Sequence, residues 1–372
     1  MIRVLHVIDS LDLGGGQTAL LNLVRFAKRS QFHLEIANLH GQGVFREAFL
    51  ELGIPVHSLS PHRWPPYYIP NLIRLLRRRR FHIVHCHLNA SNWIAKPLAA
   101  ACGVPIRIAH DQCNDTFRSQ NPLITLLDAL TNRFSSLILA VSRSTRDFLI
   151  SHENLDPSRV VYLPNAVNTE YFRPTPSTTH IAAKEELGFE PGCFLVGGIG
   201  RLVPQKNYSA FLSACAQLVQ QRPNSRFFIA GTGPEETKFR QFATDLGIAD
   251  KGTFLGFVSD TRLLYHASDV LLIPSLYEGL PLVALEAMAS GVPIVASAVD
   301  GLCDLIRSGE TGLLASSQQA EEFAKLLLHL HDSPEDRQRI AAAARSDVQR
   351  HYDAKSSVEQ VEQIYLNLLD RL

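Results

Sequence analysis

Short apolar stretches alternate with helix-like stretches along most of this chain, and this alternation restricts the possible folds more than any other feature. Strands that are apolar on both faces and separated by helices form parallel sheets covered by helices on each side. The sequence therefore predicts an α/β fold built on doubly wound, Rossmann-like sheets. A first series of predicted strands covers residues 4–8, 33–39, 83–85, 106–109, 137–141 and 160–163.

The alternation lapses in a polar, proline-bearing stretch at residues 165–192, which we interpret as a linker. A second series of predicted strands covers residues 194–199, 226–230, 252–255, 270–273 and 293–296. Since 372 residues exceed one ordinary core, we expect two domains, 1–170 and 171–350, with a ligand cleft between their strand ends. A final helix in 351–372 follows, and the sequence leaves open whether it packs back on the first domain.

Composition and termini exclude several classes of protein. Lys and Arg total 36 and Asp and Glu total 36, so no overall charge points to nucleic acid. The six cysteines form no C-x-x-C pair, which favours buried thiols in a reducing compartment. The chain enters its first strand without signal-peptide features and has no apolar run of the ~18–20 residues that a membrane span needs. We therefore expect a cytoplasmic protein.

The stretch 269–290 combines a buried strand, a glycine-bearing loop and a helix predicted to open at Pro281. Unpaired first-turn amides and the helix dipole form an anion site there. Glu278 and Glu286 bracket this site, and carboxylates accept hydrogen bonds from sugar or ribose hydroxyls. The stretch therefore predicts a phosphorylated, hydroxyl-rich ligand such as a nucleotide-sugar.

Two cations follow the first strand of the second series. Arg201 and Lys206 lie five residues apart, and a guanidinium fork with an ammonium can grip one diphosphate. When a glycosyl–phosphate bond breaks, negative charge grows on the leaving diphosphate, and fixed cations stabilise that transition state. The alternative is a pair of solvated loop charges.

The first domain offers weaker signals. Three glycines, 14–16, precede a helix predicted from residue 18, and they either approach a ligand or form a plain tight turn. His110, followed by Asp111, ends a strand at the expected cleft edge, where it could hydrogen-bond a transferred group. His85-Cys86-His87 is interpreted as strand alternation, with one side chain per sheet face, and we expect no metal site.

A basic helix end suggests a possible membrane contact. Residues 77–80 are four arginines, preceded by Trp64-Pro65-Pro66-Tyr67-Tyr68. Cations are favoured at a helix C-terminus, so a solvated helix end is one interpretation. Contact with anionic lipid at the inner membrane face is the other.

Taken in order, the motifs resemble the family-4, or group 1, retaining glycosyltransferases, which have the GT-B fold. The similar segments are G-G-G at 14–16, H-D at 110–111, A-V-S at 140–142, L-P-N-A-V-N at 163–168, G-R-L…K-N at 200–207, G-T-G-P at 231–234, L-G-F-V at 255–258 and E-G-L-P-L-V-A-L-E at 278–286. The resemblance covers nearly the whole chain. It departs at 165–168, where N-A-V-N stands in place of the usual N-G-V-D.

The resemblance implies a role for each matching position. Arg201 and Lys206 would hold the donor diphosphate, Glu278 the donor sugar and Glu286 the ribose, while His110 would lie at the reaction centre. The remaining implied donor-binding positions are Gly15, Gly16, Phe257, Val258, Gly279, Leu280 and Leu282. The family works without a bound metal or cofactor.

We therefore expect a metal-independent retaining glycosyltransferase. Its donor would be a nucleotide-diphosphate sugar, with a UDP-sugar favoured over a GDP-sugar. Its acceptor would be a glycan or a lipid-linked intermediate in the synthesis of polysaccharide, lipopolysaccharide or glycolipid, at or near the inner membrane. The alternatives are a nucleotide-sugar 2-epimerase on the same fold and a non-catalytic nucleotide-sugar-binding protein.

Overall fold

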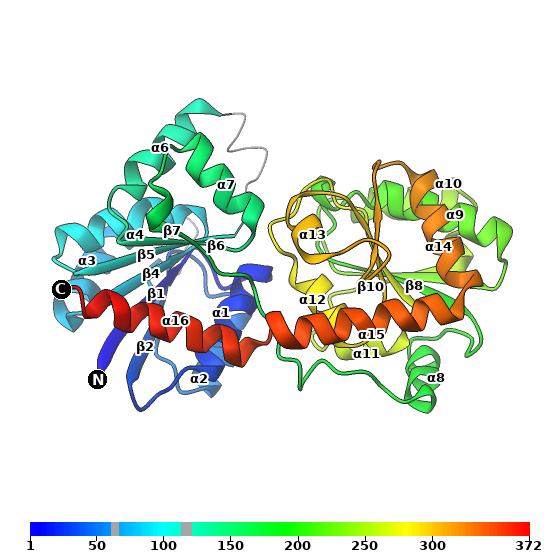
Figure 1. The fold of residues 1–372 in the computed structure, drawn as a ribbon, viewed down its shortest axis with the longest axis horizontal. Helices are drawn as coiled ribbons and strands as arrows, with labels where there is room; N and C mark the ends of the chain where they lie inside the picture. Colours follow the sequence, from blue (N-terminus) through cyan, green and yellow to red (C-terminus); the bar gives the residue numbers. More distant parts are fainter. Residues whose placement is uncertain (61–66, 113–120) are drawn as a thin grey trace. The chain divides into compact units, whose positions relative to one another are not determined.

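A computed structural model describes residues 1–60, 67–112 and 121–372 and divides the chain into two compact units (Figure 1). The first unit is Met1–Ala166 together with Ala354–Leu372, and the second unit is Val167–Asp353. The sequence placed the division near residue 170 and treated 351–372 as a separate segment. Trp64 and its two following prolines lie outside the described residues, so the membrane interpretation of that segment stays a prediction.

A seven-stranded parallel sheet forms the centre of the first unit, in the order β3-β2-β1-β4-β5-β6-β7. Its strands are β1 (Ile2–Ile8), β2 (Phe32–Asn38), β3 (Val56–Ser58), β4 (Ile83–His87), β5 (Ile106–Asp111), β6 (Leu137–Ala140) and β7 (Val160–Tyr162). Its helices are α1 (Gly15–Phe26), α2 (Phe45–Glu51), α3 (Tyr68–Arg79), α4 (Asn89–Ala101), α6 (Pro122–Asn132), α7 (Arg143–His152) and α16 (Ala354–Leu369), with a 3-10 turn η1 (Pro157–Arg159).

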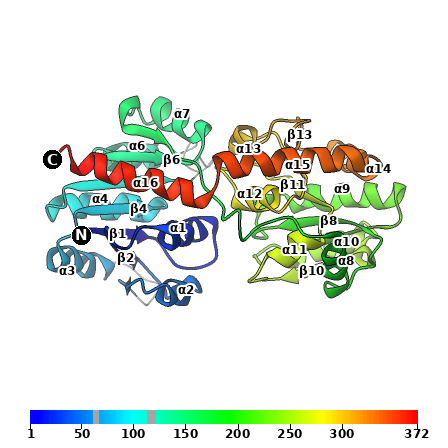
Figure 2. The ribbon, with the colours of Figure 1, turned by 60° about the horizontal axis from the view of Figure 1, so that its bottom comes forward.

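Helices cover both faces of this sheet because successive apolar side chains in each strand point to opposite sides. Val4 and Ile8 pack on one face with α1, α2 and α16. Leu5 and Val7 pack on the other face with α3 and α4. Helices α1 and α16 lie side by side in both views, although more than 300 residues separate them in sequence (Figures 1 and 2). The last helix therefore belongs to the first unit.

The second unit has a six-stranded parallel sheet in the order β10-β9-β8-β11-β12-β13. Its strands are β8 (Phe194–Ile199), β9 (Ser225–Ala230), β10 (Gly252–Gly256), β11 (Val270–Ile273), β12 (Ile294–Ser297) and β13 (Leu313–Ala315). Its helices are α8 (Ser177–Glu186), α9 (Tyr208–Gln221), α10 (Glu236–Asp245), α11 (Arg262–Ala267), α12 (Leu282–Ala289), α13 (Asp300–Leu305), α14 (Ala320–Asp332) and α15 (Pro334–His351), with 3-10 turns η2 (Pro204–Lys206) and η3 (Ala249–Lys251). One large core joins α9, α10 and α14 to the sheet, and a smaller one lies under α8 and α11.

The interpretation of residues 165–192 as a linker is partly wrong. Its middle forms α8, which packs into the second unit beside α11. The reason is a buried ion pair: the Lys184 ammonium lies 2.6 Å from an Asp269 carboxylate oxygen and donates to the Cys193 carbonyl at 2.7 Å. Local hydropathy does not predict that Lys184 is buried, because the carboxylate that pairs with its charge lies far along the chain.

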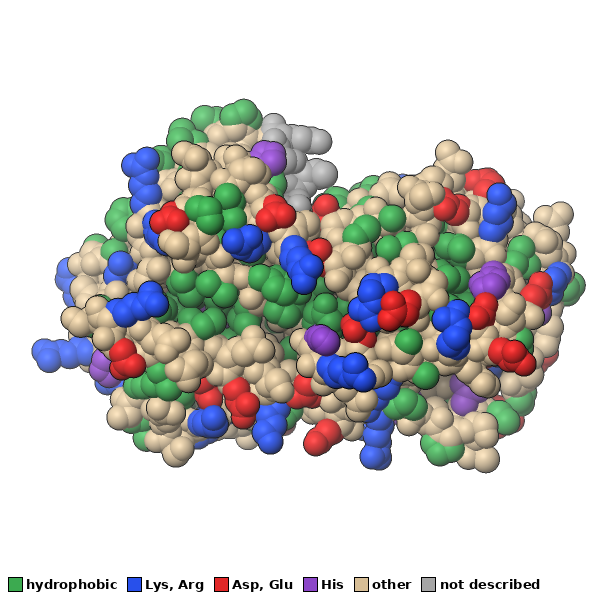
Figure 3. All heavy atoms as spheres, viewed as in Figure 1, with side chains coloured by type: hydrophobic (Ala, Val, Ile, Leu, Met, Phe, Trp, Pro, Cys, Tyr) green, Lys and Arg blue, Asp and Glu red, His purple; other side chains and the backbone are tan. Residues whose placement is uncertain are grey.

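Charged side chains of both signs are interspersed over the face shown in Figure 3. Among the described residues, none of the helices combines the length and the apolar composition that crossing a bilayer requires.

Candidate functional site

The second unit's sheet reverses its winding between β8 and β11, and the loops after these strands carry the predicted diphosphate and sugar residues. Ligands of doubly wound sheets bind outside the strand carboxyl ends at such a switch point. The two loops are joined directly, because the Leu276 amide donates to the Gln205 carbonyl at 2.8 Å and the Gln205 side chain donates to the Tyr277 carbonyl at 2.9 Å. Residues 72 positions apart are thereby fixed in one site.

Lys206 and Glu278 meet at this switch point as an ion pair. The Ser275 hydroxyl donates to the same Glu278 oxygen at 2.7 Å, so the carboxylate is held from two sides. The Glu278 side chain is 7% exposed and the Lys206 side chain 17%. An ammonium group has three donors, so this pairing leaves Lys206 able to hold an anion as well. Arg201 lies exposed to solvent, outside this pair.

Helix α12 starts one residue later than the sequence predicts. Pro281 is its N-cap, with φ −72° and ψ 126°, and makes no side-chain capping hydrogen bond. Leu280, in the loop before the helix, and Leu282, its first residue, are 2% and 7% exposed, so both are packed into the core. Their side chains are therefore structural, and a ligand at this end would meet backbone groups, including those of Gly279.

Glu286 lies in the second turn of α12 with its own partner. The Tyr265 hydroxyl donates to Glu286 Oε2 at 2.7 Å. Burial raises the pKa of Glu286 to about 7, even though the hydrogen bond from Tyr265 lowers it. The two glutamates contact different groups, so they do not form a carboxyl pair that shares a proton.

The end of β10 lies beside the end of β9, since the Gly231 amide donates to the Gly256 carbonyl at 2.7 Å. Phe257 follows and is 52% exposed, which leaves its ring available for stacking. Val258 instead packs partly against the core beneath α11. Of this predicted base-binding pair, only Phe257 presents a large apolar surface to solvent.

In the first unit, Gly15 and Gly16 are the first two residues of α1, three residues before the predicted start of that helix. The Thr18 amide donates to the Gly14 carbonyl at 3.2 Å and closes the first turn early. A Cβ on Gly16 would lie 2.9 Å from the Leu88 side chain, so close packing limits this position. The switch point of the first sheet, between β1 and β4, is where this helix begins.

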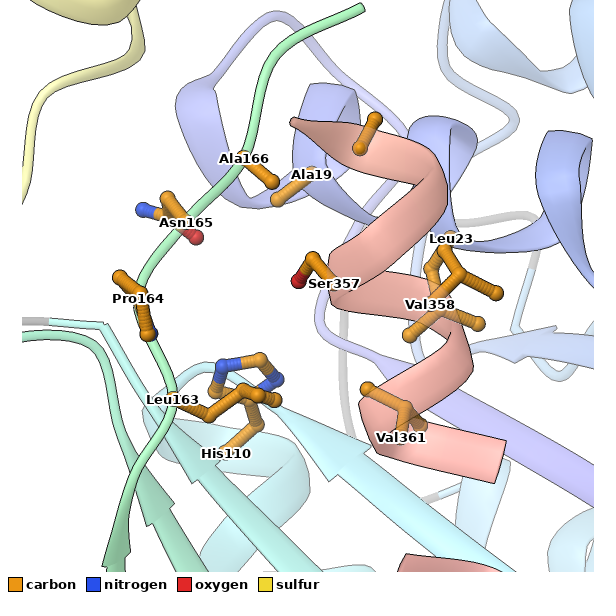
Figure 4. Close-up of a pocket in the computed structure, with 11 residues that line it drawn as sticks. Ala19, Leu23, His110, Leu163, Pro164, Asn165, Ala166, Ser357, Val358 and Val361 are labelled. Atoms are coloured by element: carbon orange, nitrogen blue, oxygen red, sulfur yellow. The ribbon is translucent and has the colours of Figure 1, made fainter. Parts of the chain in front are cut away.

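His110 lies one residue before the end of β5 and lines a pocket of about 30 Å³ (Figure 4). Leu163, Pro164 and Asn165 line it from the segment after β7, and Ser357 with neighbouring residues lines it from α16. Burial lowers the pKa of His110 to about 4, although the nearby Asp111 raises it. Within the described residues, neither ring nitrogen has a hydrogen-bond partner, so a neutral imidazole is left for a ligand.

Two partners in this site escaped the sequence analysis. Ser275 was seen only as part of a loop, and Tyr265 lies in a helix without a motif. Neither residue type signals a role by itself. Ser275 holds Glu278 across a turn, and Tyr265 holds Glu286, which is distant in sequence. The two glutamates, in contrast, lie in a recognisable motif.

Comparison with known proteins decides the family. The model for "Glycosyl transferases group 1" matches residues 181–347, and the model for "Glycosyltransferase Family 4" matches residues 13–171. A D-inositol 3-phosphate glycosyltransferase from Corynebacterium glutamicum is 31% identical over 334 residues, 84% of this chain and 79% of that protein. This chain belongs to the family-4, or group 1, glycosyltransferases.

A further relative and a solved structure align over most of this chain. An Escherichia coli UDP-Gal:alpha-D-GlcNAc-diphosphoundecaprenol alpha-1,3-galactosyltransferase is 24% identical over 307 residues, 80% of this chain and 79% of that enzyme. The structure of Anabaena HepE in complex with UDP-glucose covers the whole of both chains with a TM-score of 0.87 and 20% identity. The fold is GT-B, as the sequence predicted.

Proposed function

We propose that this group 1 glycosyltransferase transfers a sugar from a nucleotide-diphosphate sugar with retention of anomeric configuration and without a metal ion at the diphosphate. The observation that carries the proposal is the Lys206–Glu278 pair at the switch point, beside the uncapped start of α12. A UDP-sugar is the favoured donor. Similarity to a galactosyltransferase named for UDP-Gal, and to a protein solved with UDP-glucose, supports this choice.

In the proposed reaction, the bond between the anomeric carbon and the donor phosphate breaks. Arg201 and Lys206, with the first amides of α12, stabilise the charge that grows on the leaving diphosphate. Glu278 orients the donor sugar, and Glu286 accepts a hydrogen bond from a ribose hydroxyl. The acceptor hydroxyl bonds to the anomeric carbon from the face that the diphosphate leaves, and its proton passes to the leaving phosphate.

His110 completes the proposal in the first unit. Because it is neutral at physiological pH, it acts through a hydrogen bond to a sugar hydroxyl and not as a cation. The proposed acceptor is a glycan or a lipid-linked intermediate, used on the cytoplasmic side of the inner membrane. The arginines in the last turn of α3, Arg77, Arg78 and Arg79, would give peripheral contact with anionic lipid.

A donor panel followed by a transfer assay tests this function. We expect a UDP-sugar to raise the Tm of the chain more than GDP- or ADP-sugars do, and to yield a glycosylated product with a membrane extract. Lys206→Ala should lower transfer at least ~100-fold, the usual loss when one charge-stabilising group is removed. Lys238→Ala, in an exposed pair with Glu235, is the matched control and should transfer normally.

Full transfer by folded Lys206→Ala would refute the assigned site. Conversion of the nucleotide-sugar without any acceptor would favour the epimerase. Binding of donor without turnover over a broad acceptor panel would favour a non-catalytic binding protein.

A further inference from the structure

Four buried histidines share one face of the first unit's sheet. His6 on β1 is the register partner of His85 on β4, and His87 on β4 is the partner of His110 on β5. His85 and His87 are two residues apart, so both project to the same face and Cys86 projects to the other. The alternation predicted from the sequence is therefore present, and it places Cys86 on one face and both histidines together on the other.

Three of these side chains have the spacing of metal ligands. One ring nitrogen from each of His6, His85 and His87 lies within 4.8 Å of the other two, and this is the only such group of His, Cys, Asp or Glu in the described part of the chain. His6 Nδ1 lies 3.0 Å from His87 Nε2. All three side chains are at most 1% exposed.

The cluster has unused nitrogens. Nε2 of His6 and Nε2 of His85 are buried without a hydrogen-bond partner among the described residues. A buried polar group left unpaired is destabilising, so a ligand that pairs these nitrogens would stabilise the unit.

Tyr365 on α16 orients one of the three rings. Its hydroxyl lies 2.6 Å from His85 Nδ1. When that nitrogen carries the proton, the lone pair of His85 is on Nε2, the nitrogen that has no partner. Metal-binding histidines usually have their second ring nitrogen held in this way by a neighbouring oxygen.

We propose that His6, His85 and His87 bind one divalent ion of the late first-row transition metals, such as Zn²⁺, in the core of the first unit. Neutral imidazoles suit Zn²⁺, Co²⁺, Ni²⁺ and Cu²⁺, whereas Mg²⁺, Ca²⁺ and Mn²⁺ prefer oxygen ligands. Nitrogens on a tetrahedral Zn²⁺ at about 2.0–2.1 Å lie roughly 3.3 Å apart, so the rings close inward by side-chain rotation when the ion binds.

The pocket lined by His110 lies next to the cluster. The His110 ring stacks on His85 with centroids 5.4 Å apart, and it lines the cavity of about 30 Å³. That volume is enough for a water-sized group. We assign the fourth coordination position of the proposed ion to a water molecule. The ion is proposed to stabilise the sheet, and no step of sugar transfer passes through it.

Metal titration of the full chain, after treatment with a chelator, tests this site. We expect one Co²⁺ per chain with the visible absorption of a four-coordinate ion, displaced by one Zn²⁺. X-ray absorption of the Zn²⁺ form should show three imidazole nitrogens at about 2.0–2.1 Å. Tyr365→Phe should weaken Zn²⁺ binding about tenfold or more, the loss typical of removing a group that orients a ligand.

His87→Asn should abolish the visible absorption of the Co²⁺ form, while the matched control His57→Asn should retain it. His57 is a partly buried histidine of the same unit, hydrogen-bonded to Glu35 at 2.7 Å and outside the proposed ligand set. Unchanged binding by folded His87→Asn would show adventitious binding at other histidines and overturn the proposal. If that variant does not fold, the X-ray absorption spectrum of the natural chain with Zn²⁺ tests the proposal instead. A coordination shell made mainly of oxygen would then overturn the proposed site. No donor sugar is present, so the result is independent of the transfer assay.

Discussion

Glu286 shows how a single buried carboxyl group can make the stability of the chain depend on pH. Its pKa is about 4.5 in an unfolded chain, and burial raises it to about 7 in the folded chain. Between these pH values the folded chain keeps a proton that the unfolded chain has lost, so the free energy of unfolding falls as pH rises. The hydrogen bond from Tyr265 opposes this effect but does not cancel it.

Glu286→Gln should therefore gain stability relative to the natural chain as pH rises from 4.5 to 7, by on the order of 3 kcal/mol, and show no further gain above 7. Denaturant unfolding of both chains at pH 4.5, 6, 7 and 8 measures this difference. The variant should also bind the donor more weakly, because a neutral amide is a poorer acceptor for ribose hydroxyls. A stability difference that is independent of pH would contradict the raised pKa.

At the scale of elements, close packing of α13 holds the loop that precedes α12. The Gly301 amide donates to the Glu278 carbonyl at 3.3 Å, and a Cβ at position 301 would lie 1.3 Å from the Gly279 carbonyl oxygen. The clash is with the Gly279 backbone, which cannot move aside as the end of a flexible side chain can. Gly301→Ala should therefore displace this loop. We expect loss of the donor-induced rise in Tm.

Gly192→Ala is the matched control, since a Cβ there meets no atom within 4 Å and the residue has no positive φ. It should bind donor normally. Normal donor binding by Gly301→Ala would show that the loop tolerates movement and would weaken its assignment to the site.

Helix α8 is held to the second unit by the buried pair of Lys184 and Asp269, with side chains 3% and 11% exposed. Removing one member of a buried pair leaves the other charge uncompensated and typically costs about 3–5 kcal/mol. Lys184→Met should destabilise the chain by that order in denaturant unfolding. Lys238→Met, in a surface pair, should change stability by less than about 1 kcal/mol. Equal effects would contradict the role of α8 as an integral helix.

At the scale of the whole molecule, one unit is continuous in sequence and the other is not. The second unit, Val167–Asp353, has its own core and carries Lys206, Glu278 and Glu286. We expect residues 167–353 alone to unfold cooperatively and to gain Tm from the donor. The first unit requires α16, whose Val358, Val361 and Tyr365 fill one face of its core.

A chain ending at residue 353 should therefore lose the unfolding transition of the first unit and keep that of the second. Calorimetry of the full chain, the 167–353 fragment and the 1–353 fragment measures this. A stable first unit in the 1–353 fragment would show that α16 is dispensable.

The sequence by itself determined the fold class and singled out candidate donor residues, because both leave local signals. Apolar strands alternating with helices specify parallel sheets, and Glu278, Glu286, Arg201 and Lys206 lie in motifs at strand ends. Their roles stay predictions. Helix starts were misplaced by one to three residues at α12 and α1, since capping depends on φ and ψ that many residues can adopt.

Only the tertiary structure decided which distant residues meet. Lys206 pairs with Glu278 because β8 and β11 are neighbours, and the Tyr265 hydroxyl on α11 reaches Glu286 on α12. The four histidines form one cluster because β1, β4 and β5 are aligned in register. Such pairings depend on sheet order and strand register, which follow from the packing of the whole core and leave no periodic mark in the sequence.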